Sequence, residues 1–205
     1  MRADVVATVA GRPVPVDDLD AAEARLRSRR GAAALPGRGT SEVRQLRRWL
    51  TQVIVTERVI AAEAAARGLT ARGAPGEEEL MPDATARLEI GSIAAAALAH
   101  PRARALFADV TSSVRVTDDE VADYHARNPL RFAAARPDRD GWLSPSPVGP
   151  ALGEVRSAIV ENLRGAARRR AFRVWLDARC AALVELAPGY EHPGDPRQPD
   201  NTHRH

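Results

Sequence analysis

Residues 114–132 read VRVTDDEVADYHARNPLRF, and this stretch decides the expected fold. Thr117 precedes three acidic residues, so its hydroxyl and their negative charge would both meet the unpaired N–H groups at the start of a helix. Val121 and Tyr124 are three residues apart and therefore fall on one helical face. Asn128 comes directly before Pro129, a position that disfavours helical backbone angles. The stretch predicts a helix over 117–127.

Apolar periodicity predicts helices along most of the remaining chain. They are expected over 17–28, 40–68, 83–99, 101–112 and 152–186. The expected caps are Asp17, with Asp20 reaching back as in a capping box, then Thr40 or Ser41, and Asp83, while Gly68 is the expected left-handed terminator. One short strand is expected over 5–10, and residues 70–82 are expected to form a flexible connection. The fold class is therefore predicted as mostly α, with about six helices.

Composition supports one helical domain with a tail. The chain has 205 residues, and 44% of them are hydrophobic, largely alanine, whereas only 4% are aromatic. Alanine, leucine, arginine and glutamate favour packed helices over a sheet. All 30 basic residues are arginine, which is most simply the codon bias of a GC-rich genome. Because the formal net charge is only +3, nucleic-acid binding is not expected.

The expected location is the cytoplasm, with no membrane partner. No signal-peptide pattern precedes Gly11, and no uncharged stretch reaches the length of a membrane span. Cys180 is the single cysteine, so an internal disulfide is excluded. Since it lies in an apolar helix, an inert thiol is expected there.

Three stretches together resemble the SurA/PrsA/PpiD/NifM group of parvulin-associated chaperones. Residues 114–132 resemble the signature V-T-D-E-E-V-x-x-Y-Y-x-x-N-x-x-x-F of that group. Residues 5–14 resemble its opening V-A-x-V-N-G-x-x-I, with Ala10 where asparagine is usual, and residues 46–69 resemble its long helix. Residues 154–186 resemble the helix that follows the parvulin domain. The resemblance implies a SurA-N-like multi-helix domain with a short N-terminal extended segment and a long C-terminal helix that packs back on it.

The parvulin isomerase domain itself has no counterpart in the sequence. The expected organisation is a helical domain over 1–132, a linker over 133–150 in place of the parvulin domain, a completing helix over 151–187, and a polar Pro/His-rich tail over 188–205. Too few residues separate the helices for a parvulin sheet, so no peptidyl-prolyl isomerase activity is expected.

The resemblance implies a non-catalytic chaperone-like or maturation factor that holds an apolar client segment in a groove between helices. The expected groove residues are Trp49, Leu50, Val53, Phe107, Tyr124 and Trp175. An alternative remains open: an enzyme or accessory protein of actinobacterial-type secondary metabolism that takes a polyketide-like hydrophobic small molecule in the same cavity. The client or substrate and the oligomeric state stay undetermined.

Histidines and arginines supply the other candidate site residues. His125, His192, His203 and His205 are weak acid/base candidates, the last three in a tail expected to lie near the cavity mouth. His100, before Pro101, is expected to cap the end of the preceding helix. A band of arginines is a solvated helix face or a dock for an acidic partner: Arg164, Arg168, Arg169 and Arg173. No metal site and no cofactor are expected.

Overall fold

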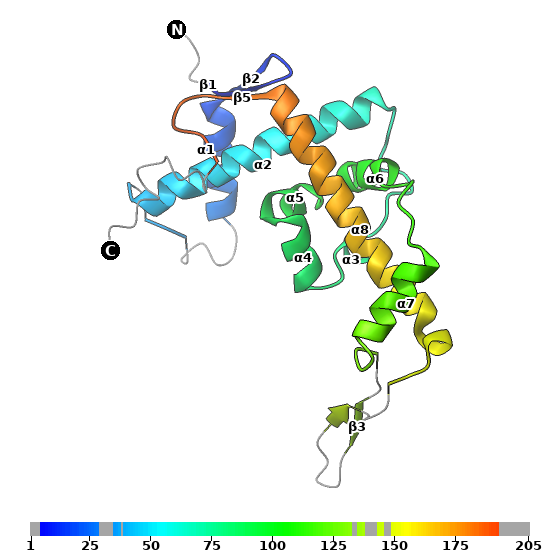
Figure 1. Ribbon diagram of the computed structural model, residues 1–205. Helices are drawn as coiled ribbons and strands as arrows, with labels where there is room; N and C mark the ends of the chain where they lie inside the picture. Colours follow the sequence, from blue (N-terminus) through cyan, green and yellow to red (C-terminus); the bar gives the residue numbers. More distant parts are fainter. Residues whose placement is uncertain are drawn as a thin grey trace. The chain divides into compact units, whose positions relative to one another are not determined.

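The structure is a computed structural model that describes residues 5–28, 35–37, 39–132, 135–137, 143–145 and 149–192. The described fold is mostly α, as predicted, and it has a small sheet near the N-terminus (Figure 1). The chain divides into two units. The first comprises residues 1–110 and 172–205, and the second comprises residues 111–171.

The sheet of the first unit joins both ends of the described chain. Strand β1 (Val5–Val9) lies between β2 (Arg12–Pro15) and β5 (Val184–Leu186), and both pairings are antiparallel. The turn between β1 and β2 has two residues, Ala10 and Gly11, with positive φ angles of 49° and 74°. Residues 184–186 were predicted as the end of a helix, and that prediction is wrong. These residues end the helix because they pair with β1 as an antiparallel strand, in which Glu185 lies opposite Thr8.

The described residues between β2 and Val110 form six helical segments, of which α3 is a single turn. They are α1 (Val16–Arg27), α2 (Ser41–Ala66), α3 (Glu77–Leu80), α4 (Ala84–Ile90), α5 (Ser92–Ala97) and α6 (Pro101–Val110). The predicted caps at Thr40 and Asp83 are confirmed, since their side chains accept hydrogen bonds from Val43 N and Ala86 N. Gly68 has a positive φ of 66° just after the end of α2, as predicted.

Three local predictions for the first unit are wrong. Asp17 lies inside the first turn of α1 rather than capping it, and Asp20 pairs with Arg47. Residues 70–82 are not simply a flexible connection, because they include α3 and the buried side chain of Met81. The helix expected over 83–99 is broken at Gly91, whose φ of 86° is incompatible with a continuous helix.

The core of the first unit is closed by the C-terminal part of α8 (Leu152–Leu183). Phe172 and Leu176 of α8 are buried in one cluster with Phe107 of α6, Val6 of β1 and residues of α2. The predicted packing of the long C-terminal helix onto the N-terminal helices is therefore confirmed.

The second unit contains α7 (Asp118–Arg127) and the first part of α8, residues 152–171. The predicted cap at Thr117 is confirmed, and Glu120 completes a capping box by accepting from Thr117 N. Arg156 pairs with Asp118 at 2.5 Å, and Val121 and Ile159 are fully buried. Within the predicted linker, the described residues form a strand pair, β3 (Ala135–Pro137) with β4 (Leu143–Pro145).

Candidate functional site

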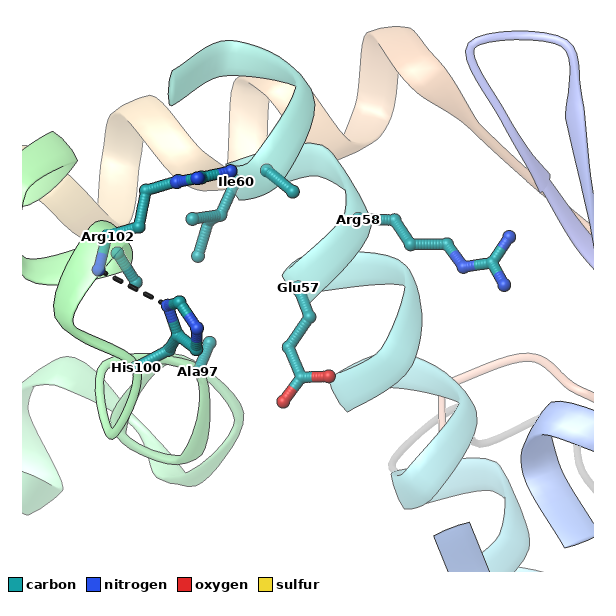
Figure 2. Close-up of a pocket in the computed structure, with 8 residues that line it drawn as sticks. Glu57, Arg58, Ile60, Ala97, His100 and Arg102 are labelled. Atoms are coloured by element: carbon teal, nitrogen blue, oxygen red, sulfur yellow. Dashed lines mark hydrogen bonds between the residues drawn. The ribbon is translucent and has the colours of Figure 1, made fainter. Parts of the chain in front are cut away.

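A pocket of about 380 Å³ opens between α2 and the junction of α5 with α6 (Figure 2). Apolar side chains form its floor, and four polar residues lie around them. The lining residues are Glu57, Arg58, Ile60 and Ala61 of α2, then Ala97, His100, Arg102 and Ala103. Pockets of this volume bind small ligands or single side chains of a partner.

Helical spacing explains how α2 builds its wall of the pocket. Glu57, Ile60 and Ala61 are three and four residues apart, so they lie on one face of the helix. Ile60 is buried, whereas Glu57 is exposed as a residue although the surrounding protein partly encloses its carboxyl group, so this face is apolar at depth and charged at the rim. The sequence marks Glu57 only as an interruption of an apolar stripe.

His100 caps the start of α6, not the end of the preceding helix as predicted. Its Nδ1 accepts a hydrogen bond from the backbone N–H of Arg102 at 3.2 Å, and its carbonyl accepts from Ala103 N at 3.0 Å. An imidazole nitrogen that accepts an N–H carries no proton itself. The neutral His100 ring therefore carries its proton on Nε2, as a donor available to the pocket.

The Glu57 carboxyl group has a pKa raised above its ordinary value of 4.5. Burial by the surrounding protein is the main cause, and it is opposed only in part by the positive charge of Arg25 and, when its ring is protonated, by that of His100. Arg58 is turned away from Glu57 in Figure 2, and its guanidinium group instead donates to Asp18 and to the carbonyl of Pro13. Arg58 therefore does not form an ion pair with Glu57.

Three of the six residues predicted to line a groove are buried instead of lining an open surface. Leu50, Val53 and Phe107 are buried, with relative exposures of 6%, 9% and 1%, so they form core instead of an open surface. Trp49 is partly buried and donates from Nε1 to Ser92 Oγ at 3.3 Å. The apolar periodicity that suggested a groove marks the packed face of the helices.

The two remaining aromatic residues of that predicted set lie in different units. Trp175 stacks on Phe172 at a centroid distance of 5.6 Å, and Arg67 covers its ring at 5.5 Å. Tyr124 belongs to the second unit, where its ring lies 6.4 Å from that of Phe132 and its hydroxyl accepts from Asn162.

Two of the four candidate histidines belong to the described residues, His125 in the second unit and His192 in the first. His125 Nε2 lies 2.9 Å from the carbonyl oxygen of Pro150 within the second unit. His192 lines another pocket of the first unit. His203 and His205 lie outside the described residues.

The pocket that includes His192 has a volume of about 300 Å³ and contains the single cysteine. Its polar lining residues include Thr56, Arg173 and Asp177. Burial raises the pKa of the Cys180 thiol, a hydrogen bond with Thr56 lowers it in part, and Asp177 raises it further. A thiol with a raised pKa is mostly protonated at neutral pH, which favours an inert cysteine, as the sequence suggests.

The predicted arginine band is not a uniform solvated surface. Arg164 is exposed, but Arg168 Nε donates to Thr111 Oγ1 at 2.8 Å, and Arg169 is only 7% exposed beside Gly165. Arg169 is therefore unavailable to an acidic partner. Arg164, Arg168 and Arg169 belong to the second unit, whereas Arg173 belongs to the first. Its Nε lies 4.0 Å from Oδ2 of Asp177.

Neither a cluster of metal-binding side chains nor a membrane-spanning helix is found in the part of the chain that the structure describes. No group of three or more His, Cys, Asp or Glu side chains there is placed to hold a metal ion. None of the helices in the described ranges is long and apolar enough to cross a membrane.

Comparison with known protein families gives a match over the N-terminal part of the chain. A family model described as "Family of unknown function (DUF7158)" matches residues 5–42. The match covers β1, β2, α1 and the first residues of α2, and it ends before the pocket residues. No curated protein and no solved structure matches the chain.

Proposed function

We propose that the protein is a non-catalytic chaperone-like or maturation factor that binds an apolar client segment in the pocket between α2, α5 and α6. The observation that carries this proposal is the pocket's apolar floor, made by Ile60, Ala97 and Ala103, with Ala61 at its side. The resemblance of residues 114–132 and 46–69 to parvulin-associated chaperones supports the same function. Prolyl isomerase activity is not part of the proposal.

The size and chemistry of the pocket suit a transient client. Burying one valine or leucine side chain contributes about 1.5–3 kcal/mol. One such side chain on a small floor gives weak binding that exchanges quickly. Weak, exchanging contacts suit a protein that must release its client after folding or assembly.

One observation favours the alternative, an enzyme acting on a small hydrophobic molecule. Glu57 has a raised pKa and lies with His100 in one pocket, which is the arrangement that acid/base chemistry uses. No hydrogen bond joins the two side chains among the described residues, and no hydroxyl or thiol lines the pocket. We therefore favour binding over catalysis.

Ala61 and Ala62 provide a matched pair for testing the pocket. Both are exposed alanines in α2, but only Ala61 lines the pocket. A tryptophan costs the helix the same intrinsic propensity at either position. Ala61→Trp fills the pocket, whereas Ala62→Trp leaves it open.

The test measures how well each variant keeps an unfolded model protein from aggregating. We expect Ala61→Trp to weaken client binding by about tenfold, the loss of roughly 1.4 kcal/mol of apolar contact. Ala62→Trp is expected to match the wild type, and thermal unfolding should confirm that both variants fold. Equal activity of both variants would refute the proposed site.

A further inference from the structure

We propose that Glu57 and His100 together recognise a backbone amide of the bound segment, with the carboxyl group accepting its N–H and the imidazole donating to its carbonyl oxygen. The ligand class is an extended peptide that places a small aliphatic side chain on the pocket floor. This inference rests on the proposed function and specifies the chemistry of the same site.

The donor is set by the backbone of α6. Because His100 Nδ1 accepts from Arg102 N, the proton of the neutral ring is on Nε2. Nε2 makes no hydrogen bond to another described residue, so it is free to donate to a ligand. The imidazole is thus held as a donor by the same contact that caps the helix.

The acceptor is the Glu57 carboxyl group. It makes no hydrogen bond or ion pair with any described residue, whereas the adjacent Arg58 is engaged by Asp18 and by Pro13. Arg25 is a positively charged residue that acts on Glu57 without a hydrogen bond to it, so the carboxyl oxygens remain able to accept an N–H from a ligand.

The placement of the two groups matches the geometry of a peptide unit. Figure 2 shows the Glu57 carboxyl group and the His100 ring on different walls of the pocket, one from α2 and the other from the junction before α6. In a trans peptide the N–H and the C=O point in opposite directions. A donor and an acceptor on separate walls therefore complement one amide lying between them.

The next feature is the choice of ligand side chain beside the amide, which depends on Ile60, Ala97 and Ala103. They offer an apolar surface with two small alanine side chains, which leaves space for a valine or leucine side chain of the ligand. Recognition by one amide and one aliphatic side chain tolerates many sequences, because every peptide contains the amide.

The experiment compares two small probes with the same aliphatic group, the methylamide and the methyl ester of 3-methylbutanoic acid. The methylamide contains one amide, and the ester lacks its N–H. Binding of each is measured by NMR titration, following the backbone amides of Ala61 and Ala103. The protein is the full chain, as wild type, Glu57→Ala and His100→Asn. Asparagine retains a side-chain acceptor for the helix cap but removes the imidazole N–H donor.

We expect the wild type to bind the methylamide at least about fivefold more tightly than the ester, since a hydrogen bond to a charged acceptor is lost in the ester. Glu57→Ala should bind both probes equally, and His100→Asn should weaken both. Equal binding of the two probes by the wild type, or no binding of either, would overturn the inference. The proposed function is tested by a different measurement. It is refuted if Ala61→Trp prevents the aggregation of an unfolded client as well as the wild type does.

Discussion

The ring of Phe107 in α6 lies 5.0 Å from the ring of Phe172 in α8, centroid to centroid, at an interplanar angle of 50°. Tilted aromatic pairs at this separation are favourable beyond the area they bury. Phe172 also stacks on Trp175, so a short aromatic run on α8 packs against the N-terminal helices. Residues 172–183 therefore complete the core of the first unit.

Replacing Phe172 with alanine should destabilise the protein by about 3–5 kcal/mol, the usual cost of removing a fully buried phenylalanine. Val174 lies two residues along the same helix and is 66% exposed. Val174→Ala should change stability by less than about 0.5 kcal/mol. Urea unfolding followed by circular dichroism measures both variants. Equal, small effects would contradict the packing of α8 into the core.

Ala10 is strained by its positive φ of 49°, so replacing it should stabilise the protein. Asparagine adopts this conformation more readily, and Ala10→Asn should raise the free energy of unfolding by about 0.5–1 kcal/mol. Gly11, with a φ of 74°, is the control, because Gly11→Ala should destabilise the same turn. The melting temperatures of the two variants should move in opposite directions. A lower melting temperature for Ala10→Asn would contradict this conformation of the turn.

Glu23 should stabilise the protein at neutral pH and lose that effect in acid. Burial raises its pKa, but hydrogen bonds from Arg47 and Arg27, with their charges, outweigh burial, so the pKa is below 4.5. A lowered pKa gives stability that is present above 4.5 and is lost as the pH falls through the folded-state pKa. Glu23→Gln should cost about 1–3 kcal/mol at pH 7 and less below pH 4.5. A cost that is the same at pH 3 and pH 7 would contradict the ionic contacts.

Glu57 should show the opposite dependence, because its pKa is raised above 4.5. The folded state then takes up a proton before the unfolded state does as the pH falls, so ionised Glu57 opposes folding at neutral pH. Glu57→Gln should therefore be more stable than the wild type at pH 7, and the difference should vanish below pH 4.5. Urea unfolding at a series of pH values measures this. A variant that is less stable than the wild type at pH 7 would contradict the raised pKa.

Local signals in the sequence were sufficient for most helix ends. Thr40, Asp83 and Thr117 cap helices where their side chains suggested it, and Gly68 ends α2. Each of these features depends on residues within a few positions of the cap. The mostly α fold follows from the same local patterns.

Features that depend on distant residues were missed. Residues 184–186 continue an apolar helix pattern, and only their pairing with β1, near the other end of the chain, makes them a strand. Arg169 looks like part of a solvated band, but Gly165 leaves space beside it, and it is buried. Glu57 and His100 belong to one pocket only because α2 packs against α5 and α6.

Site-specific photo-cross-linking tests the central claim, that the pocket binds an apolar client, most directly. A benzophenone side chain is placed at position 61 or at position 62, and each protein is irradiated with a permanently unfolded, carboxymethylated model protein. Both positions are exposed on α2, but only position 61 faces the pocket. We predict strong cross-linking from position 61 and little from position 62. Equal yields from both positions, or none from position 61 while the client is still held, would contradict the account.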